Sequence, residues 1–319
     1  MNASPFAPDV AMLAPGKFVD PLRTSDGKER AQVALKTLET LWFNTGTLCN
    51  LTCTGCYIES SPINDALVYL AGSDVARFLD EIARDGLPVR EIGFTGGEPF
   101  MNPQIMAMIG DALERDFAVL VLTNAMKPMR RHDAPLLALK AEHGARLTLR
   151  VSLDHHSPAI HEAERGAGTW HVAMDGLRWL SEQGFSVAGA GRLLAGESQA
   201  KAREGYAALF ADNAIAIDAN DPARLVLFPE MDAGADIAEI STECWGILDK
   251  SPEEVMCATS RMVVHRKGEA APRVAACTLL PYDPQFDLGA SLREAAVPVR
   301  LNHPHCARFC VLGGASCSA

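Results

Sequence analysis

The amino-acid sequence predicts an α/β protein built around a parallel sheet. Strand-like segments alternate with helical segments six times between residues 41 and 228, a pattern typical of parallel strands joined by right-handed crossovers. Residues 117–122 form an unbroken apolar run, which is typical of a strand buried on both faces. Clusters of cysteine and glycine directly follow the first two strands. In parallel sheets the carboxyl ends of the strands are where ligands bind.

The chain opens with an extended segment and a first strand–helix unit. Residues 1–35 contain four prolines, so we expect an extended lead-in there. Residues 41–45 are predicted to form the first strand. Ser73 is expected to cap the following helix, and Gly86 is expected to end it. The apolar residues between them repeat at helical spacing.

The remaining elements follow in strict alternation. The strands are expected at residues 91–95, 117–122, 146–153, 185–192 and 224–228. The helices are expected near residues 103–115, 133–142, 170–184 and 198–211. A further domain, residues 236–319, is expected after a domain formed by residues 36–235.

Two of these strands place polar residues on one face. Arg150, Ser152 and Asp154 alternate with apolar residues, so a strand directs all three to the same side. In the next strand small residues precede Arg192, which leaves room for a ligand. A strand with one solvated face, or tight packing under a neighbour, would give the same patterns.

Three cysteines, Cys49, Cys53 and Cys56, fall within eight residues after the first strand. Thiolates are soft ligands that select zinc or iron–sulfur clusters. Three of them on one loop can hold three corners of a cubane cluster and leave the fourth iron open. A zinc knuckle and three reduced core cysteines are the alternatives, although a structural zinc site usually has four protein ligands.

This spacing resembles the cluster motif of radical S-adenosylmethionine (SAM) enzymes. The segment Gly96, Gly97, Glu98 and Pro99 resembles the GGEP loop of that family, which meets the SAM amino group. The resemblance implies that the sheet closes into a partial (β/α)6 barrel. It also implies a [4Fe–4S] cluster whose open iron binds SAM, and reductive cleavage of SAM to methionine and a 5′-deoxyadenosyl radical. The family often has an aromatic residue before the third cysteine, whereas here Gly55 precedes Cys56 and Tyr57 follows it.

The resemblance also implies contacts to SAM. Tyr57 is a candidate for the adenine side, and Ser152 with Asp154 resembles the family segment that contacts the ribose and methionine end. Arg165 is a candidate for the SAM carboxylate, and Arg192 is a second one. Capping of a helix or a surface ion pair would explain Arg165 equally. For catalysis, only the weaker candidates Glu230 and His155 stand out, and both also fit ordinary loop residues.

The last six cysteines lie beyond residue 240. A hairpin with its turn near Lys267 and Gly268 is expected to bring Cys257 and Cys277 to the same end, and Cys306 with Cys310 forms another close pair. On chemistry alone zinc would suit such a closed site. The segment resembles a shortened SPASM or "twitch" domain, which implies one auxiliary [4Fe–4S] cluster on these four cysteines. Cys244 and Cys317 are spare, and either could replace one of the four.

Net charge, apolar content and cysteine spacing argue against several classes of protein. The net charge of −11 and the absence of a basic run disfavour general nucleic-acid binding. No apolar run is long enough to span a bilayer, and the start of the chain does not resemble a signal peptide. Nine unevenly spaced cysteines fit metal ligation in a reducing cytoplasm better than a disulfide framework.

Three functions remain as hypotheses. The first is a radical SAM oxidoreductase that abstracts hydrogen from a small molecule, with the auxiliary cluster taking up an electron. The second is a maturase that forms a crosslink or thioether in a peptide or protein, and the 48 residues before Cys49 leave no room for an added leader-binding domain in front. The third is a non-catalytic zinc-binding module. The first two would need a low-potential electron donor such as flavodoxin or ferredoxin.

Overall fold

The computed structural model describes residues 13–193, 196–230 and 236–314. It contains an eight-stranded sheet in the order β7-β6-β5-β4-β3-β2-β8-β9. The six strands from β2 to β7 are parallel neighbours. They are β2 (Thr40–Asn44), β3 (Glu91–Thr95), β4 (Ala118–Thr123), β5 (Leu147–Ser152), β6 (Ser186–Arg192) and β7 (Leu225–Phe228).

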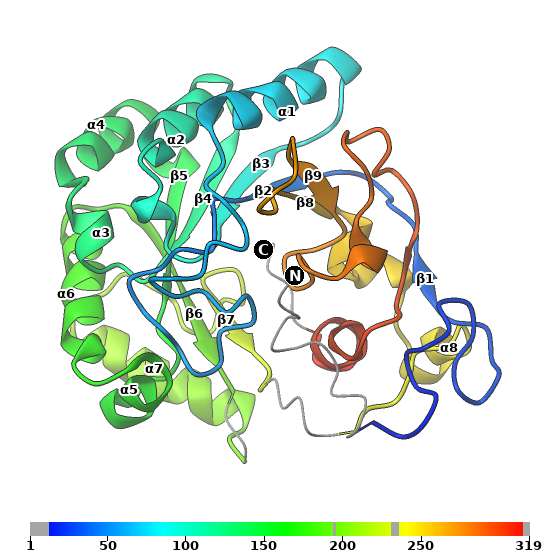
Figure 1. The fold of residues 1–319 in the computed structure, drawn as a ribbon. Helices are drawn as coiled ribbons and strands as arrows, with labels where there is room; N and C mark the ends of the chain where they lie inside the picture. Colours follow the sequence, from blue (N-terminus) through cyan, green and yellow to red (C-terminus); the bar gives the residue numbers. More distant parts are fainter. Residues whose placement is uncertain (1–12, 194–195, 231–235, 315–319) are drawn as a thin grey trace.

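Helices cover the outer side of this sheet (Figure 1). The long ones are α1 (Gly72–Asp85), α2 (Ile105–Glu114), α4 (Asp133–His143), α6 (Thr169–Glu182) and α7 (Gln199–Asp212), and the shorter ones are α3 (Lys127–Arg130) and α5 (Pro158–Arg165). Their apolar faces pack with the strands into one large core. Within the described ranges, no helix combines the length and apolar content needed to cross a membrane.

All six predicted strands are confirmed to within one or two residues. The predicted helix cap is wrong: α1 begins at Gly72, and Ala71 is the N-cap residue. The carboxylate of Asp74 accepts a hydrogen bond of 3.1 Å from the backbone N–H of Ala71. Ser73 therefore lies inside the first turn, and the acidic residue stabilises the helix start in its place.

The C-terminal hairpin extends the main sheet. Strand β8 (Ser260–Val264) pairs in parallel with β2, and β9 (Arg273–Ala275) pairs antiparallel with β8. The hairpin is therefore confirmed, and its cysteine-bearing segment shares the edge of the barrel sheet. A second core packs around it. The short helices of this region are α8 (Cys244–Leu248), a π-helix (Cys306–Leu312) and three 3-10 helices, Pro252–Glu254, Met256–Ala258 and Pro284–Phe286. Two more 3-10 helices, Pro99–Met101 and Gly144–Arg146, lie in the barrel.

The described part of the lead-in packs against the C-terminal region. Strand β1 (Gln32–Val33) pairs antiparallel with β10 (Val299–Arg300). The carboxylate of Glu239 accepts hydrogen bonds from the backbone N–H of Phe18 at 2.7 Å and from the guanidinium of Arg30 at 2.5 Å. The described lead-in thus packs on the C-terminal region, with β1 on the same side of the barrel as β8 (Figure 1).

Candidate active site

A cavity opens at the carboxyl ends of the barrel strands. Its wall is formed by the cysteine loop after β2, by residues at the ends of β3 to β7, and by one residue of the C-terminal π-helix. The lining includes Cys49, Cys53 and Cys56. The fold therefore brings the predicted cluster ligands to the end of the sheet where the chemistry of such barrels takes place.

The cysteine loop holds its sulfur atoms with backbone donors. Cys49 Sγ accepts a hydrogen bond from the N–H of Leu51 at 3.4 Å, and Cys56 Sγ accepts one from the N–H of Ser60 at 3.3 Å. Burial raises the pKa of Cys49 to about 12 and also raises the pKa of Cys53. Without a metal these two thiols are neutral at pH 7, so metal binding must displace their protons.

The spacing of the thiols bears on which metal centre fits. A zinc ion with Zn–S bonds of about 2.3 Å holds its sulfur ligands about 3.8 Å apart. Among the residues that the structure describes, no three cysteine sulfurs all lie within 4.8 Å of one another. In neither cysteine set do three described sulfur atoms gather as closely as the ligands of a single zinc ion.

The two glycines after β3 pack against the chain that enters the cysteine loop. A Cβ at Gly97 would lie 2.3 Å from the carbonyl oxygen of Leu48, and one at Gly96, whose φ is +136°, would lie 2.5 Å from the carbonyl oxygen of Gly46. The N–H of Gly97 donates to that Gly46 oxygen at 2.9 Å. Both glycines line the cavity, so they serve close backbone packing as well as access.

Glu98 and Pro99 lie behind the cavity wall. Glu98 is 1% exposed, and its carboxylate accepts hydrogen bonds from the N–H of Asn124 at 2.8 Å and the hydroxyl of Thr123 at 2.9 Å. Burial raises its pKa to about 7, and these hydrogen bonds oppose that shift. Pro99 starts the short 3-10 helix that Glu98 caps. In this structure Glu98 joins the loop after β3 to the end of β4.

Asp154 and Arg165 form a bidentate ion pair inside the cavity. Arg165 Nε donates to Asp154 Oδ2 at 2.9 Å, and Nη2 donates to Oδ1 at 3.0 Å. Burial opposes ionisation of Asp154, but the guanidinium outweighs it and holds the pKa of this carboxyl below its usual value. The two residues are separate candidates in the sequence, and their pairing is not visible there because Asp154 follows β5 and Arg165 ends α5, so that they meet only in the fold.

Arg192 explains the glycine before the third cysteine. Its guanidinium forms an ion pair with Glu164 and lies over Gly55, where a Cβ would come within 2.5 Å of Arg192 Nη1. The space that a larger residue would fill next to Cys56 is thus occupied by an arginine from the end of β6. Tyr57 and Ser152 also line the cavity.

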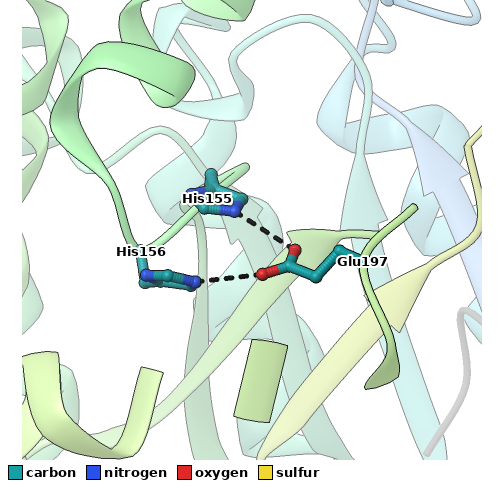
Figure 2. Close-up of side chains that lie close together, drawn as sticks. All are labelled: His155, His156 and Glu197. Atoms are coloured by element: carbon teal, nitrogen blue, oxygen red, sulfur yellow. Dashed lines mark hydrogen bonds and ion pairs between the residues drawn. The ribbon is translucent and has the colours of Figure 1, made fainter. Parts of the chain in front are cut away.

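His155 and His156 do not line the cavity, and their side chains converge on Glu197 (Figure 2). Each imidazole Nε2 lies 3.2 Å from one oxygen of the Glu197 carboxylate. The Nδ1 of His155 accepts a hydrogen bond of 2.9 Å from the N–H of Ser157, so its Nε2 carries the proton and has no lone pair for a metal. The three residues therefore act as a hydrogen-bonded clasp between the loops after β5 and β6.

The cavity also has an aromatic wall that sequence analysis missed. Phe228, at the end of β7, packs against Phe309 of the π-helix with ring centroids 5.3 Å apart, and both line the cavity. No local motif marks either residue. Glu230, a predicted candidate, is exposed and is not part of the lining.

Phe309 connects the barrel to a second cavity. This smaller cavity is lined by Cys257, Cys277, Cys306 and Cys310 together with apolar residues. The four cysteines that the sequence paired by hairpin and spacing thus surround one space. Cys244 is not part of its lining and lies 3.6 Å from the hydroxyl of Ser241; Cys317 falls outside the described residues.

Comparison with known proteins agrees with this architecture. The family model of the Radical SAM superfamily matches residues 43–202, half of the chain. The antilisterial bacteriocin subtilosin biosynthesis protein AlbA of Bacillus subtilis is 30% identical over 140 residues, which are 44% of this chain and 30% of AlbA. The GTP 3′,8-cyclase of Rhodococcus opacus is 32% identical over 165 residues, which cover 44% of this chain and 47% of the cyclase. The chain thus spans less than half of the length of either relative.

Solved structures share the fold. Streptococcus suis SuiB bound to S-adenosylmethionine superposes with a TM-score of 0.56 at 14% identity, covering 80% of this chain and 64% of SuiB. Native anSMEcpe with bound AdoMet gives a TM-score of 0.55 at 14% identity, covering 80% of this chain and 79% of that chain. Taken with the cysteine loop at the carboxyl ends of the partial barrel, these matches show that the chain belongs to the radical SAM superfamily and carries a cysteine-rich region after its barrel.

Proposed function

We propose that this protein is a radical SAM enzyme that binds its SAM-cleaving [4Fe–4S] cluster on Cys49, Cys53 and Cys56. The observation that carries the proposal is that these three thiols and the Asp154–Arg165 pair face one cavity at the carboxyl ends of the strands. When bound, the cluster supplies the electron that cleaves SAM to methionine and a 5′-deoxyadenosyl radical, which abstracts a hydrogen atom from the substrate.

The protein's own residues position SAM. The cavity offers two guanidinium groups, Arg165 and Arg192, each balanced by one carboxylate. A SAM carboxylate can accept hydrogen bonds from a guanidinium, and Asp154 can accept bonds from the ribose hydroxyls. Gly96 and Gly97 allow the chain to approach the amino group closely. The two ion pairs hold both guanidinium groups in place, which reduces the side-chain entropy that is lost when SAM binds.

We further propose one auxiliary [4Fe–4S] cluster on Cys257, Cys277, Cys306 and Cys310. Support comes from the cavity that these four cysteines share and from its otherwise apolar lining. Burial raises the pKa of Cys257 to about 11, so a metal is needed to hold this sulfur as thiolate. Phe309 of the aromatic wall faces the first cavity, and its neighbour Cys310 in the same π-helix lines the second, so the two proposed centres share this helix.

For the substrate, we retain a small molecule that is oxidised with the auxiliary cluster as electron acceptor. One observation favours a peptide as the second candidate. A wider depression lies next to the cysteine loop, lined by Asn64, Asp65 and Tyr282 among others. A peptide could occupy it while one side chain enters the cavity. Among the proteins of like fold, SuiB has been solved bound to the precursor peptide SuiA.

Anaerobic reconstitution tests the proposed class directly. With dithionite and SAM, the wild-type protein should form 5′-deoxyadenosine, and the Cys49→Ala variant should form none. Deuterium transfer from a labelled candidate substrate into 5′-deoxyadenosine would identify the substrate class. Retention of zinc by the cysteine loop, with no cleavage of SAM, would refute the proposed function.

A further inference from the structure

Arg261 on β8 is a buried arginine without an acidic partner. It is 1% exposed, and an arginine side chain keeps its charge in a protein. Its guanidinium donates hydrogen bonds to four backbone carbonyl oxygens, those of Cys257 at 2.6 Å, Ser260 at 2.8 Å, Ala295 at 3.0 Å and Val297 at 3.1 Å. Within the described ranges, no carboxylate forms an ion pair with it.

A buried charge of this kind is costly unless an opposite charge lies nearby. The guanidinium donates a hydrogen bond to the carbonyl oxygen of Cys257, and the thiols of Cys257 and Cys277 lie close enough to influence its charge. Both are among the four cysteines around the C-terminal cavity. The rest of that cavity wall is apolar, with Val255, Phe286 and Leu301 among its members. As neutral thiols the cysteines offer the guanidinium no charge, whereas four metal-bound thiolates offer a strongly anionic centre.

We propose that Arg261 is the fixed counter-charge of the auxiliary cluster and raises its reduction potential. This inference rests on the proposed function, because it requires a redox-active centre on the four cysteines. One electron from a low-potential donor adds a negative charge to the cluster. A cation held in an apolar surrounding stabilises the reduced, more negative form more than the oxidised form. Arg261 thereby makes the auxiliary cluster a better electron acceptor.

Through these hydrogen bonds Arg261 also joins the segment of Cys257 and Ser260 to the segment of Ala295 and Val297. A purely structural role would need only these hydrogen bonds. The two roles differ in what they predict for the cluster. A structural role is sensitive to geometry and leaves the potential unchanged as long as the cluster is bound. A counter-charge role depends on the sign of the side chain and shifts the potential when that charge is removed.

The test compares Arg261→Gln with Arg261→Lys by potentiometric titration followed by spin resonance. The glutamine variant should show an auxiliary cluster whose reduction equilibrium constant is at least about tenfold lower, equivalent to about 59 mV for one electron. The lysine variant should stay near the wild-type value. Arg266→Gln is the matched control, because Arg266 lies after the same strand but is paired with Asp287 at 2.7 Å; its potential should not move.

Each outcome decides the question. An unchanged potential in Arg261→Gln, or an equal fall in Arg261→Gln and Arg261→Lys, overturns the counter-charge. If the glutamine variant cannot be recovered folded, recovery of the lysine variant with both clusters and a wild-type potential supports it, and loss of both variants overturns it. Failure of the proposed function would look different: wild-type protein would then contain zinc or no metal at the C-terminal cysteines and would give only one iron–sulfur signal.

Discussion

The two cysteine sites of this molecule are assembled in opposite ways. Cys49, Cys53 and Cys56 come from a single loop and border a cavity with two charged pairs. The four C-terminal cysteines come from segments up to 53 residues apart in the chain, Cys257 to Cys310, and they line an otherwise apolar cavity. A four-iron cluster on the three thiols of the first site would leave one iron open for a small molecule. The second has four cysteines and can close around its metal completely.

This difference separates what a local motif provides from what the fold must provide. A contiguous loop keeps its cysteines close in any compact state. The C-terminal set, in contrast, requires β8 to pair with β2 and the π-helix to pack against the end of β7. Changes within the loop should therefore affect SAM chemistry alone. Changes in the C-terminal set should affect the second centre and the packing around it.

The largest effect is expected from the loop. Cys53→Ala removes one of three ligands, so SAM cleavage under dithionite should be lost completely. Cys244→Ala is the matched control, because Cys244 lines neither cavity, and it should retain both iron and activity. Measurement of 5′-deoxyadenosine by liquid chromatography checks both variants; activity in Cys53→Ala would remove this residue from the ligand set.

The Cys306→Ser variant should affect the second cysteine site and leave the first intact. Cys306 is buried in the second cavity, so the variant should lose about four of eight irons and keep the cluster that binds SAM. SAM cleavage without substrate should continue, while substrate oxidation should fail. Iron analysis and spin resonance provide the measurement. Retention of about eight irons would show that another residue, such as the spare Cys317, serves as ligand.

Asp154→Asn tests the charged wall of the first cavity. Charge-assisted hydrogen bonds contribute roughly 1.5–3 kcal/mol each, so SAM affinity should fall by about one to two decades while the cluster signal persists. The matched control is Asp133→Asn, because Asp133 forms a similar pair with Arg130 at 2.7 Å outside the cavity. SAM titration of the reduced cluster measures both. Equal midpoints for Asp154→Asn and wild type would place this pair outside SAM binding.

The Glu98→Gln variant distinguishes a structural role of Glu98 from a contact with SAM. The Glu98 carboxylate already accepts from Asn124 and Thr123 behind the cavity, so the substitution should lower the free energy of unfolding by about 1–3 kcal/mol through a mismatched buried donor. We expect SAM affinity to change little. A fall of about one to two decades in affinity at unchanged stability would instead support the contact with the SAM amino group expected from the sequence. Urea unfolding and SAM titration together decide.

The smallest effect is expected at the clasp. Glu197→Gln replaces one of the two acceptor oxygens that face His155 and His156 (Figure 2). Loss of one such hydrogen bond should lower stability by about 1 kcal/mol and leave zinc affinity unaltered. Urea unfolding and a zinc titration provide the measurements. Tight zinc binding by the wild type that is lost in the variant would show a metal site in place of the clasp.

Much of the fold was predictable because its signals are local. Apolar runs such as residues 117–122 locate the buried strands, and the cysteine and glycine loops follow β2 and β3 as expected. The pairing of β8 with β2 was not predictable in this way. It joins residues about 220 positions apart, and the period of a strand does not specify its partner.

The residues of the candidate site also fall into those that local sequence predicts and those that depend on the packing of distant segments. Tyr57, Ser152 and Asp154 were predicted and line the cavity. The pairing of Asp154 with Arg165, the position of Glu98 behind the wall, and the contribution of Phe309 were missed. Each of these depends on where a side chain points after distant segments pack, and that information is absent from the spacing of residues in one segment.

If both proposals hold, the molecule carries two four-iron centres, of which only the one in the barrel binds SAM. Iron and zinc analysis of reconstituted wild-type protein, combined with spin resonance before and after SAM addition, measures both properties in one sample. We expect about eight irons per chain and two signals, one of which changes with SAM. About four irons, stoichiometric zinc, or two signals that both respond to SAM would overturn the two-centre arrangement.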